Sequence, residues 1–304
     1  MNVSQKIKDL RNQQGWSQEK LAEKLGVSRQ AVTKWETGAG TPDIENLAAL
    51  ARVFGVTTDE LLFGVEAQVA PETACESITA FDLEREKNYE FEVGCARIVS
   101  LRTTTAEKLQ VRLVSKTIDD VDRAVKVYLD TSGRNLSIRA QNQGVIADAL
   151  LRRELDVIID VPTAFSESAE LTLNAQVLSI KDVRMDVEVG GQVTYVLLSD
   201  VEGHVELDLT GNVEAWADDV RGKLDLNQIG AVSILHVTEG TAFSAHAKGL
   251  LGRRTLLFSR DGGPCDVPAT EDAPLSIELA GARAELTVDV TTTGIPTSEQ
   301  LCEH

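Results

Sequence analysis

Four hydrogen-bonding side chains recur along a short segment near the N-terminus, at a spacing that an α-helix would bring to one face. They are Arg29, Gln30, Thr33 and Lys34. Arginine matches the O6 and N7 atoms of guanine, glutamine matches the N6 and N7 atoms of adenine, and a helix is about as wide as the major groove of DNA. These residue types at this spacing predict contacts with base edges. The alternative is an ordinary solvated helix face.

Two short helices joined by a tight turn are needed to present this face. Ser17 and Ser28 stand where their hydroxyls can cap the first turn of each helix, and Gly26 is expected to end the first one. Apolar side chains recur at helical spacing on the opposite sides: Leu21, Ala22, Leu25, Ala31, Val32 and Trp35. Because Trp35 belongs to this apolar stripe, we expect it to pack in a core and not against a base.

The segment SQEKLAEKLGVSRQAVTKWETG, residues 17–38, resembles the helix-turn-helix of the Cro and phage-repressor family, also called the xenobiotic-response-element family. The likeness runs from about Met1 to Gly64 and includes the family's typical ending, DELLFG. It implies five short helices, with the first at about 3–14, the fourth capped by Asp43 and the fifth opened by a T-x-x-E capping box at Thr57. The resemblance therefore implies a DNA-binding domain.

The resemblance also implies roles for individual positions. The family's base-edge readers fall on Arg29, Gln30, Thr33 and Lys34. Gln18 becomes a phosphate contact at the start of the second helix, Ser28 lies near the DNA backbone, and Arg11 and Glu36 match a pair that ties the first helix to the end of the third. The loop at 39–43 departs from the pattern, because it lacks the cations found in several phage members. We therefore expect weaker phosphate attraction, with more of the affinity left to dimerisation or to a few direct contacts.

The charge of the chain is divided unequally. Residues 1–64 hold eight basic and eight acidic residues, whereas the remaining 240 hold 22 basic and 40 acidic ones and carry the whole net charge of −18. DNA repels a surface of that sign over a Debye length of about 8 Å at physiological salt. The second part of the chain is therefore expected to lie away from the duplex.

From about residue 78 the hydrophobic pattern changes from helical to alternating, which predicts strands separated by turn-forming residues. An internal repeat follows, whose units begin at positions 182, 200 and 219: Asp182-Val183, Asp200-Val201-Glu202-Gly203 and Asp219-Val220-Arg221-Gly222. A period near 20 predicts a solenoid-like stack of strands. These units, together with LDVIIDVP at 155–162, are similar to adhesin-like β-repeat domains of unknown function that occur behind bacterial membrane or regulatory modules.

The spacing of other reactive residues disfavours a catalytic or metal site. Asp182, Asp200 and Asp219 could form a carboxylate column, but each one precedes a valine at a predicted turn, so we expect solvated turn residues. The scattered histidines lack the spacing of zinc ligands: His204, His236 and His246. The cysteines have no C-x-x-C pair, which predicts free thiols: Cys75, Cys95, Cys265 and Cys302. We expect no metal, no cofactor and no enzymatic activity.

The sequence predicts a multi-domain α and β protein. A five-helix helix-turn-helix domain at 1–64 is followed by a linker at 65–77, an all-β repeat domain at 78–290 and a disordered or loosely packed tail at 291–304. We expect a sequence-specific transcriptional regulator, a repressor that binds double-stranded DNA as a homodimer. The acidic β domain would serve oligomerisation, sensing of a small molecule or binding of a protein partner. No hydrophobic run is long enough to span a membrane, so we expect a cytoplasmic protein.

Two other interpretations stay open. A carbohydrate-active β-solenoid enzyme with an accessory helix-turn-helix would need two carboxylates about 5–10 Å apart in a groove. A protein-interaction adaptor would instead bind its partner by adding a strand to an exposed sheet edge.

Overall fold

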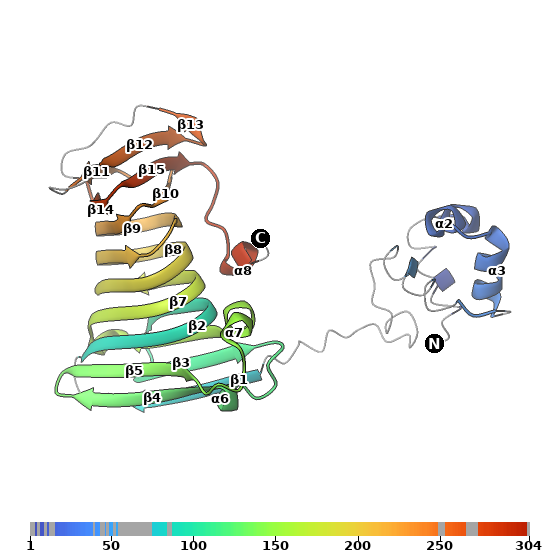
Figure 1. Ribbon diagram of the computed structural model, residues 1–304, viewed down its shortest axis with the longest axis horizontal. Helices are drawn as coiled ribbons and strands as arrows, with labels where there is room; N and C mark the ends of the chain where they lie inside the picture. Colours follow the sequence, from blue (N-terminus) through green and yellow to red (C-terminus); the bar gives the residue numbers. More distant parts are fainter. Residues whose placement is uncertain are drawn as a thin grey trace. The chain divides into compact units, whose positions relative to one another are not determined.

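The chain divides into two compact units, Met1–Thr73 and Ala74–His304. The computed structural model describes residues 4, 7, 8, 11, 16–38, 40–42, 46, 49, 50, 53, 75–83, 87–248, 253–265 and 273–302 (Figure 1). Most of the expected linker at 65–77 lies outside the described residues.

In the N-terminal unit two helices have described bounds, α2 (Gln18–Leu25) and α3 (Arg29–Thr37). Ser17 and Ser28 cap them as predicted, since each hydroxyl accepts the backbone amide three residues later, at 3.1 and 3.2 Å. Gly26 ends α2 in the left-handed conformation, with φ of 68°. The expected first, fourth and fifth helices fall largely outside the described residues, so the count of five helices stays a prediction.

The described residues of the second unit, called the β unit from here on, form one 15-stranded sheet with short helices at its margins. Its elements are β1 (Cys75–Asp82), β2 (Lys87–Thr104), β3 (Lys108–Ser115), α6 (Val121–Ala124), β4 (Val125–Ser132), β5 (Asn135–Asn142), α7 (Asp148–Glu154), β6 (Asp156–Pro162), η1 (Thr163–Phe165), β7 (Ser166–Val183), β8 (Asp186–Leu209), β9 (Glu214–Ile229), β10 (Val232–Thr238), β11 (Phe243–Ala247), β12 (Arg254–Arg260), β13 (Gly263–Pro264), β14 (Leu275–Ala282), β15 (Ala284–Thr291) and α8 (Ser298–Cys302). The strand order β1-β3-β6-β2-β7-β8-β9-β10-β15-β12-β13 does not close on itself, so the sheet is open.

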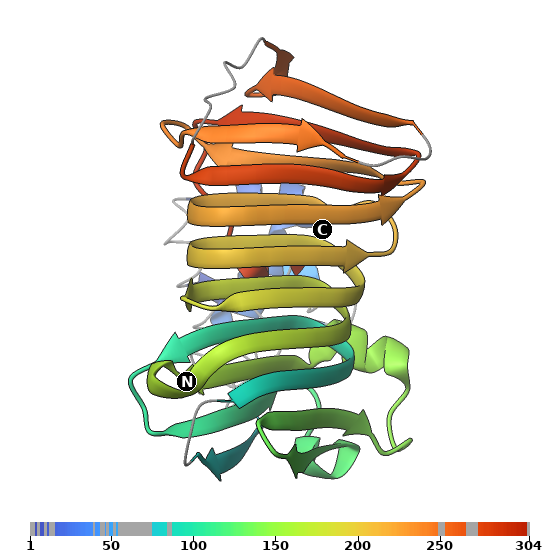
Figure 2. The same cartoon turned by 90° about the vertical axis from the view of Figure 1, so that its left-hand side faces the viewer.

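Four long parallel strands, β2, β7, β8 and β9, form the middle of the β unit, and Figure 2 shows them as successive rungs. Val183 of β7 lies opposite Val201 of β8, which in turn lies opposite Val220 of β9. These three valines are the ones that follow the repeated aspartates, so the register of the stack confirms the spacing of the predicted repeat. The buried side chains are mostly valine and leucine, and each rung covers the apolar row of its neighbour.

Each long strand bends round this core and contributes to two faces of the sheet (Figure 1). The start of β9, at 214–217, pairs with β10, whereas its second half, at 222–229, pairs with β14. We call the face that holds 222–229 the acidic face, for the carboxylates described below. The face that holds β10, β15 and β12 is called the α8 face, because α8 packs on the same side of β7.

Left-handed backbone marks the corners where the chain passes from the α8 face to the acidic face. Asp182, Asp200 and Asp219 have φ of 56°, 52° and 47°, a conformation that aspartate tolerates better than most residues. Each one lies inside a long strand and bends it, whereas the sequence predicted a turn between strands. Gly222 has φ of 108°, and a Cβ atom there would lie 2.1 Å from the carbonyl oxygen of Gly203 in the next rung. The repeated Asp-Val-x-Gly units are therefore the corners of the stack.

The C-terminal tail is packed, which corrects the expectation of a loosely packed segment for residues 292–302. Leu301 of α8 is 7% exposed, and it covers outward-facing apolar side chains of β2, β7 and β8: Ile98, Val177 and Leu197. Glu299 of the same helix binds Arg97 at 2.7 Å. The tail packs because these outward-facing side chains need a cover, and strand alternation alone does not show which segment supplies it.

Among the described residues, no helix is long and apolar enough to cross a membrane.

We predict that Gly222→Ala destabilises the β unit far more than Gly230→Ala. Both glycines have positive φ, 108° and 67°, but a Cβ at Gly230 would meet nothing within 4 Å. Gly230→Ala should therefore cost only the backbone strain, about 1 kcal/mol, and Gly222→Ala about 3 kcal/mol because of the added clash. Urea unfolding followed by far-UV circular dichroism measures both. Equal losses would show that the close approach of the rungs is unimportant.

Candidate functional site

An apolar core holds α3 in place from one side. Leu21 and Val32 are fully buried, and Trp35 is 7% exposed. Ile7 and Leu50 join the same cluster from other parts of the N-terminal unit. The burial of Trp35 confirms that its ring packs in the core, so it does not offer a surface on which a base could stack.

A network of polar side chains fixes the start of α2 against the end of α3. Arg11 donates from Nε and Nη2 to the two carboxylate oxygens of Glu36, at 2.6 and 3.1 Å. The side chain of Glu36 is 2% exposed, and Gln18 also donates to it, at 2.9 Å. The hydrogen bond to Glu36 raises the pKa of Arg11, so this guanidinium group stays charged. The Arg11–Glu36 pair implied by the family resemblance is thus present.

The predicted base-reading residues divide into two groups. Arg29, Gln30 and Lys34 are exposed, and none of their side chains makes a hydrogen bond or ion pair with another described residue. Thr33 is half-buried, and its hydroxyl lies 3.1 Å from Gln18 Oε1 and 3.0 Å from the Arg29 carbonyl. The exposed group can therefore donate to a ligand outside the helix, whereas the Thr33 and Gln18 side chains are engaged with each other.

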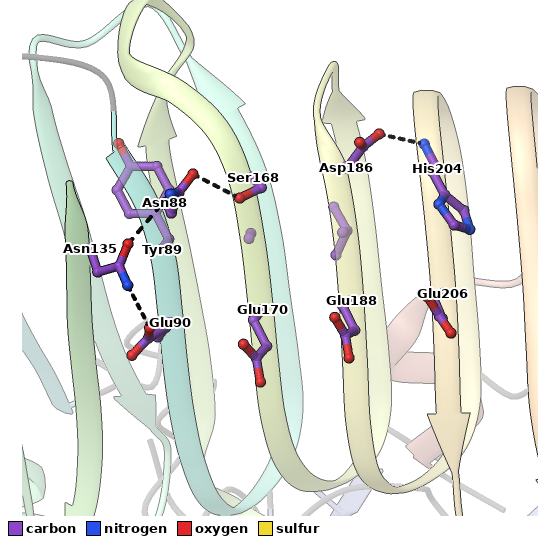
Figure 3. A pocket seen from close by; sticks show the side chains of 12 residues that line it. Asn88, Tyr89, Glu90, Asn135, Ser168, Glu170, Asp186, Glu188, His204 and Glu206 are labelled. Atoms are coloured by element: carbon purple, nitrogen blue, oxygen red, sulfur yellow. Dashed lines mark hydrogen bonds between the residues drawn. The ribbon is translucent and has the colours of Figure 1, made fainter.

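The acidic face of the β unit carries a row of glutamates that the sequence analysis missed. Glu90, Glu170, Glu188 and Glu206 line a hollow of about 320 Å³ and stand side by side on neighbouring rungs (Figure 3). Register places Glu90 opposite Glu170, and Glu170 opposite Glu188. The last three recur every 18 residues, close to the spacing of the Asp-Val units, so that spacing could have revealed the row. Burial and the charges of Glu170 and Glu206 raise the pKa of Glu188.

This row does not have the geometry of a sugar-cleaving site. A glycosidase places its two carboxylates on either side of the scissile bond, with one of them acting from the opposite face of the sugar ring. The four glutamates of the acidic face project from neighbouring rungs of one sheet and approach any bound sugar from the same side. The enzyme interpretation therefore gains no support from the hollow.

One cluster on the acidic face has the composition of a metal site. His204, Glu206 and Asp225 each offer a ligand atom, and these atoms lie within 4.8 Å of one another. However, Asp225 Oδ2 already accepts from Lys223 Nζ at 2.5 Å and lies 2.9 Å from His204 Nε2. The ammonium group of Lys223 supplies the positive charge that a metal would otherwise bring. His204 and Glu206 are two residues apart on β8, but Asp225 lies on the neighbouring strand β9, so the cluster has no local spacing that the sequence could reveal.

We predict that Glu36→Gln destabilises the N-terminal unit by about 3 kcal/mol, because it leaves the guanidinium of Arg11 without its partner. Amide hydrogen exchange should show about a hundredfold loss of protection in α2 and α3. Glu23→Gln is the matched control, since the Glu23 side chain is 70% exposed and should change protection little. A small effect of Glu36→Gln would mean that the apolar core alone positions α3.

We predict that Glu188→Gln raises the unfolding midpoint of the β unit at pH 7. The pKa of Glu188 is raised in the folded state, so its ionisation costs stability, and this cost grows as pH rises through the unfolded and then the folded pKa. The gain should therefore disappear well below the ordinary glutamate pKa of 4.5, where both states are protonated. Thermal unfolding at pH 3.5 and pH 7, with the exposed Glu107→Gln as control, measures the difference. A gain of the same size at both pH values would contradict repulsion within the row.

Residues 7–61 match the family model described as helix-turn-helix. Three curated relatives share this region. The transcriptional activator BcrR of Enterococcus faecalis is 45% identical over 73 residues, which are 24% of this chain and 36% of that protein. The prophage-derived regulator YonR of Bacillus subtilis is 41% identical over 64 residues, 21% of this chain and 59% of YonR. The phage repressor RstR of Vibrio cholerae is 33% identical over 66 residues, 22% of this chain and 60% of RstR.

Two solved structures resemble different parts of the chain. The P22 c2 repressor in complex with an operator is 31% identical, covers 21% of this chain and 97% of its own, and gives a TM-score of 0.21. A proposed cell adhesion protein from Clostridium sporogenes is 7% identical, covers 71% of this chain and 99% of its own, and gives a TM-score of 0.34. This chain spans 36–59% of the length of the first two curated relatives. Its N-terminal region is a helix-turn-helix domain, and the curated proteins that share it are transcriptional regulators.

Proposed function

We propose that this chain is a sequence-specific transcriptional regulator whose α3 enters the major groove of double-stranded DNA. The observation that carries the proposal is that one side of α3 is buried in the N-terminal unit and the other side is exposed. Val32, Trp35 and Glu36 are buried on the first, while Arg29 and Lys34 are exposed on the second. A rigid helix with free donors on one face is the geometry that reads base edges.

The polar residues of this region take different parts in the proposed complex. Arg29, Gln30 and Lys34 contact base edges directly. Thr33 has its hydroxyl engaged with Gln18 and the backbone, so its methyl group is the part available for contact with a thymine methyl. Gln18 at the start of α2 and Ser28 at the start of α3 lie on the phosphate side.

A second copy of the chain is needed for useful affinity. α3 has only nine residues and covers a few base pairs, and the described loop residues at 40–42 bring no cation to the phosphates. A homodimer on two half-sites about 34 Å apart supplies the missing contacts. We propose repression as the outcome, although the related domains belong to both an activator and a repressor. The acidic, solenoid-like β unit, at about 78–290, provides the regulatory part.

We predict that Gln30→Ala weakens binding by about 1–3 kcal/mol at one base pair and relaxes the preference there, because a bidentate contact to adenine is lost. The cognate site is first selected from a random DNA library with the full-length protein. Fluorescence anisotropy then compares this site with its single-base variants.

Lys20→Ala is the matched control for this experiment. Lys20 lies on α2, where its ammonium binds Glu23 at 2.8 Å, so its loss should change all DNA sequences alike. If the selection yields no preferred sequence, or if Gln30→Ala weakens every sequence equally, α3 does not read bases.

A further inference from the structure

A second hollow, of about 770 Å³, opens on the α8 face near the C-terminal end of the stack. Its floor belongs to β9, β10, β15 and β12, and one wall is the segment 293–296 that leads to α8. Its volume falls in the range of small-molecule sites. None of the residues predicted as functional from the sequence lies in it.

The floor of this hollow is apolar and accessible. Ile234 and Leu257 flank Thr287 in one row across three strands, and they are 38% and 44% exposed. Trp216 stands in the next row, where its ring stacks on that of His236 with 4.9 Å between centroids. A ligand that covers these apolar side chains removes them from water, and this burial stabilises the complex by about 25 cal/mol per Å² of apolar surface.

The polar groups of the hollow are acidic. Glu214, Asp261 and Asp289 line it, and none of its described lining residues is lysine or arginine. His236 lies between two of these carboxylates, with Nδ1 3.2 Å from Asp289 and Nε2 3.0 Å from Glu214. Even with His236 protonated, the three carboxylates leave a net negative charge. The hollow that holds the glutamate row on the acidic face has no such apolar floor.

Two of these carboxylates are fixed by the fold. Asp289 is 5% exposed, and it accepts hydrogen bonds from the Ser259 hydroxyl and, at 3.0 Å, from the Gly262 amide. Although burial opposes ionisation, these hydrogen bonds and His236 lower its pKa, so it stays charged. Asp261 accepts from the amide and hydroxyl of Thr292, at 2.9 and 3.1 Å, and thereby holds the wall segment in place. The side chain of Glu214 is 40% exposed; its Oε1 lies 3.0 Å from His236, while its Oε2 makes no hydrogen bond with another described residue and can face a ligand.

We propose that this hollow binds a small lipophilic organic cation, with its apolar part on Ile234 and Leu257 and its charge beside Glu214. Charge complementarity selects this class, because an organic anion is repelled and a hydrated inorganic cation makes no use of the apolar floor. The inference deepens the proposed function, since it gives the β unit the sensing role of a regulator. It is tested without DNA, so that the failure of either proposal leaves the other standing.

The test uses two probes of the same shape and opposite charge, tetraphenylphosphonium and tetraphenylborate. Isothermal titration calorimetry of the full-length protein in 150 mM salt should show one phosphonium ion bound per chain. The borate ion should bind at least tenfold more weakly. Absence of phosphonium binding overturns the proposal, and so does equal binding of the two ions.

Matched variants locate the bound cation. Glu214→Gln removes one charge from the hollow, and Glu170→Gln removes one charge from the acidic face, so both change the net charge equally. Glu214→Gln should weaken phosphonium binding by about fivefold, the size expected for one charge a few ångströms away in a water-exposed site, and Glu170→Gln by less than twofold. Leu257→Gln, a second variant on the floor, should weaken it by a similar factor. Circular dichroism checks that each variant is folded. Equal losses for the two glutamate variants would show that the cation merely gathers on an acidic surface, which overturns the proposal.

Discussion

In-register stacking of parallel strands is the constraint on which the β unit depends. A valine or leucine on one rung is buried only because the same kind of side chain follows one repeat later on the next rung. In-register stacking acts in the same way on outward-facing positions. It places similar side chains side by side even where their charges repel. Glu170, Glu188 and Glu206 repel one another for this reason, and the raised pKa of Glu188 reflects that repulsion as well as burial. Stacking also places Trp216 of β9 opposite His236 of β10.

The N-terminal unit obeys a different constraint, in which a buried ion pair replaces repetition. Arg11 and Glu36 are far apart in the sequence, and their side chains are only 12% and 2% exposed. Removing either would leave a charge without a partner in a small apolar core, so the pair fixes α3 relative to the rest of the unit. Because Gln18 and Thr33 join the same network, the polar side of α3 is only partly free, and three of the four expected readers are open.

Local patterns predicted the local features of this chain well. Caps at Ser17 and Ser28 need only neighbouring residues, and the Asp-Val spacing recorded the register of the rungs because that register is a sequence distance. Local patterns could not predict the features that join segments far apart in the sequence. The cover that Leu301 gives to the outer side of the stack, and the hollow formed by β9, β10, β12 and β15, depend on which rungs become neighbours in space. The glutamate row lies between these cases. Its regular spacing is visible in the sequence, but the repeat was interpreted from its aspartates, and the glutamates were not considered.

The segment at 292–302 runs across the strands and not along them. At one end Thr292 is tied to Asp261 beside β12, and at the other Glu299 is tied to Arg97 on β2, at the far side of the rungs. The tail is therefore bonded at its two ends to strands that are not neighbours in the sheet, so it links rungs that share no backbone hydrogen bond.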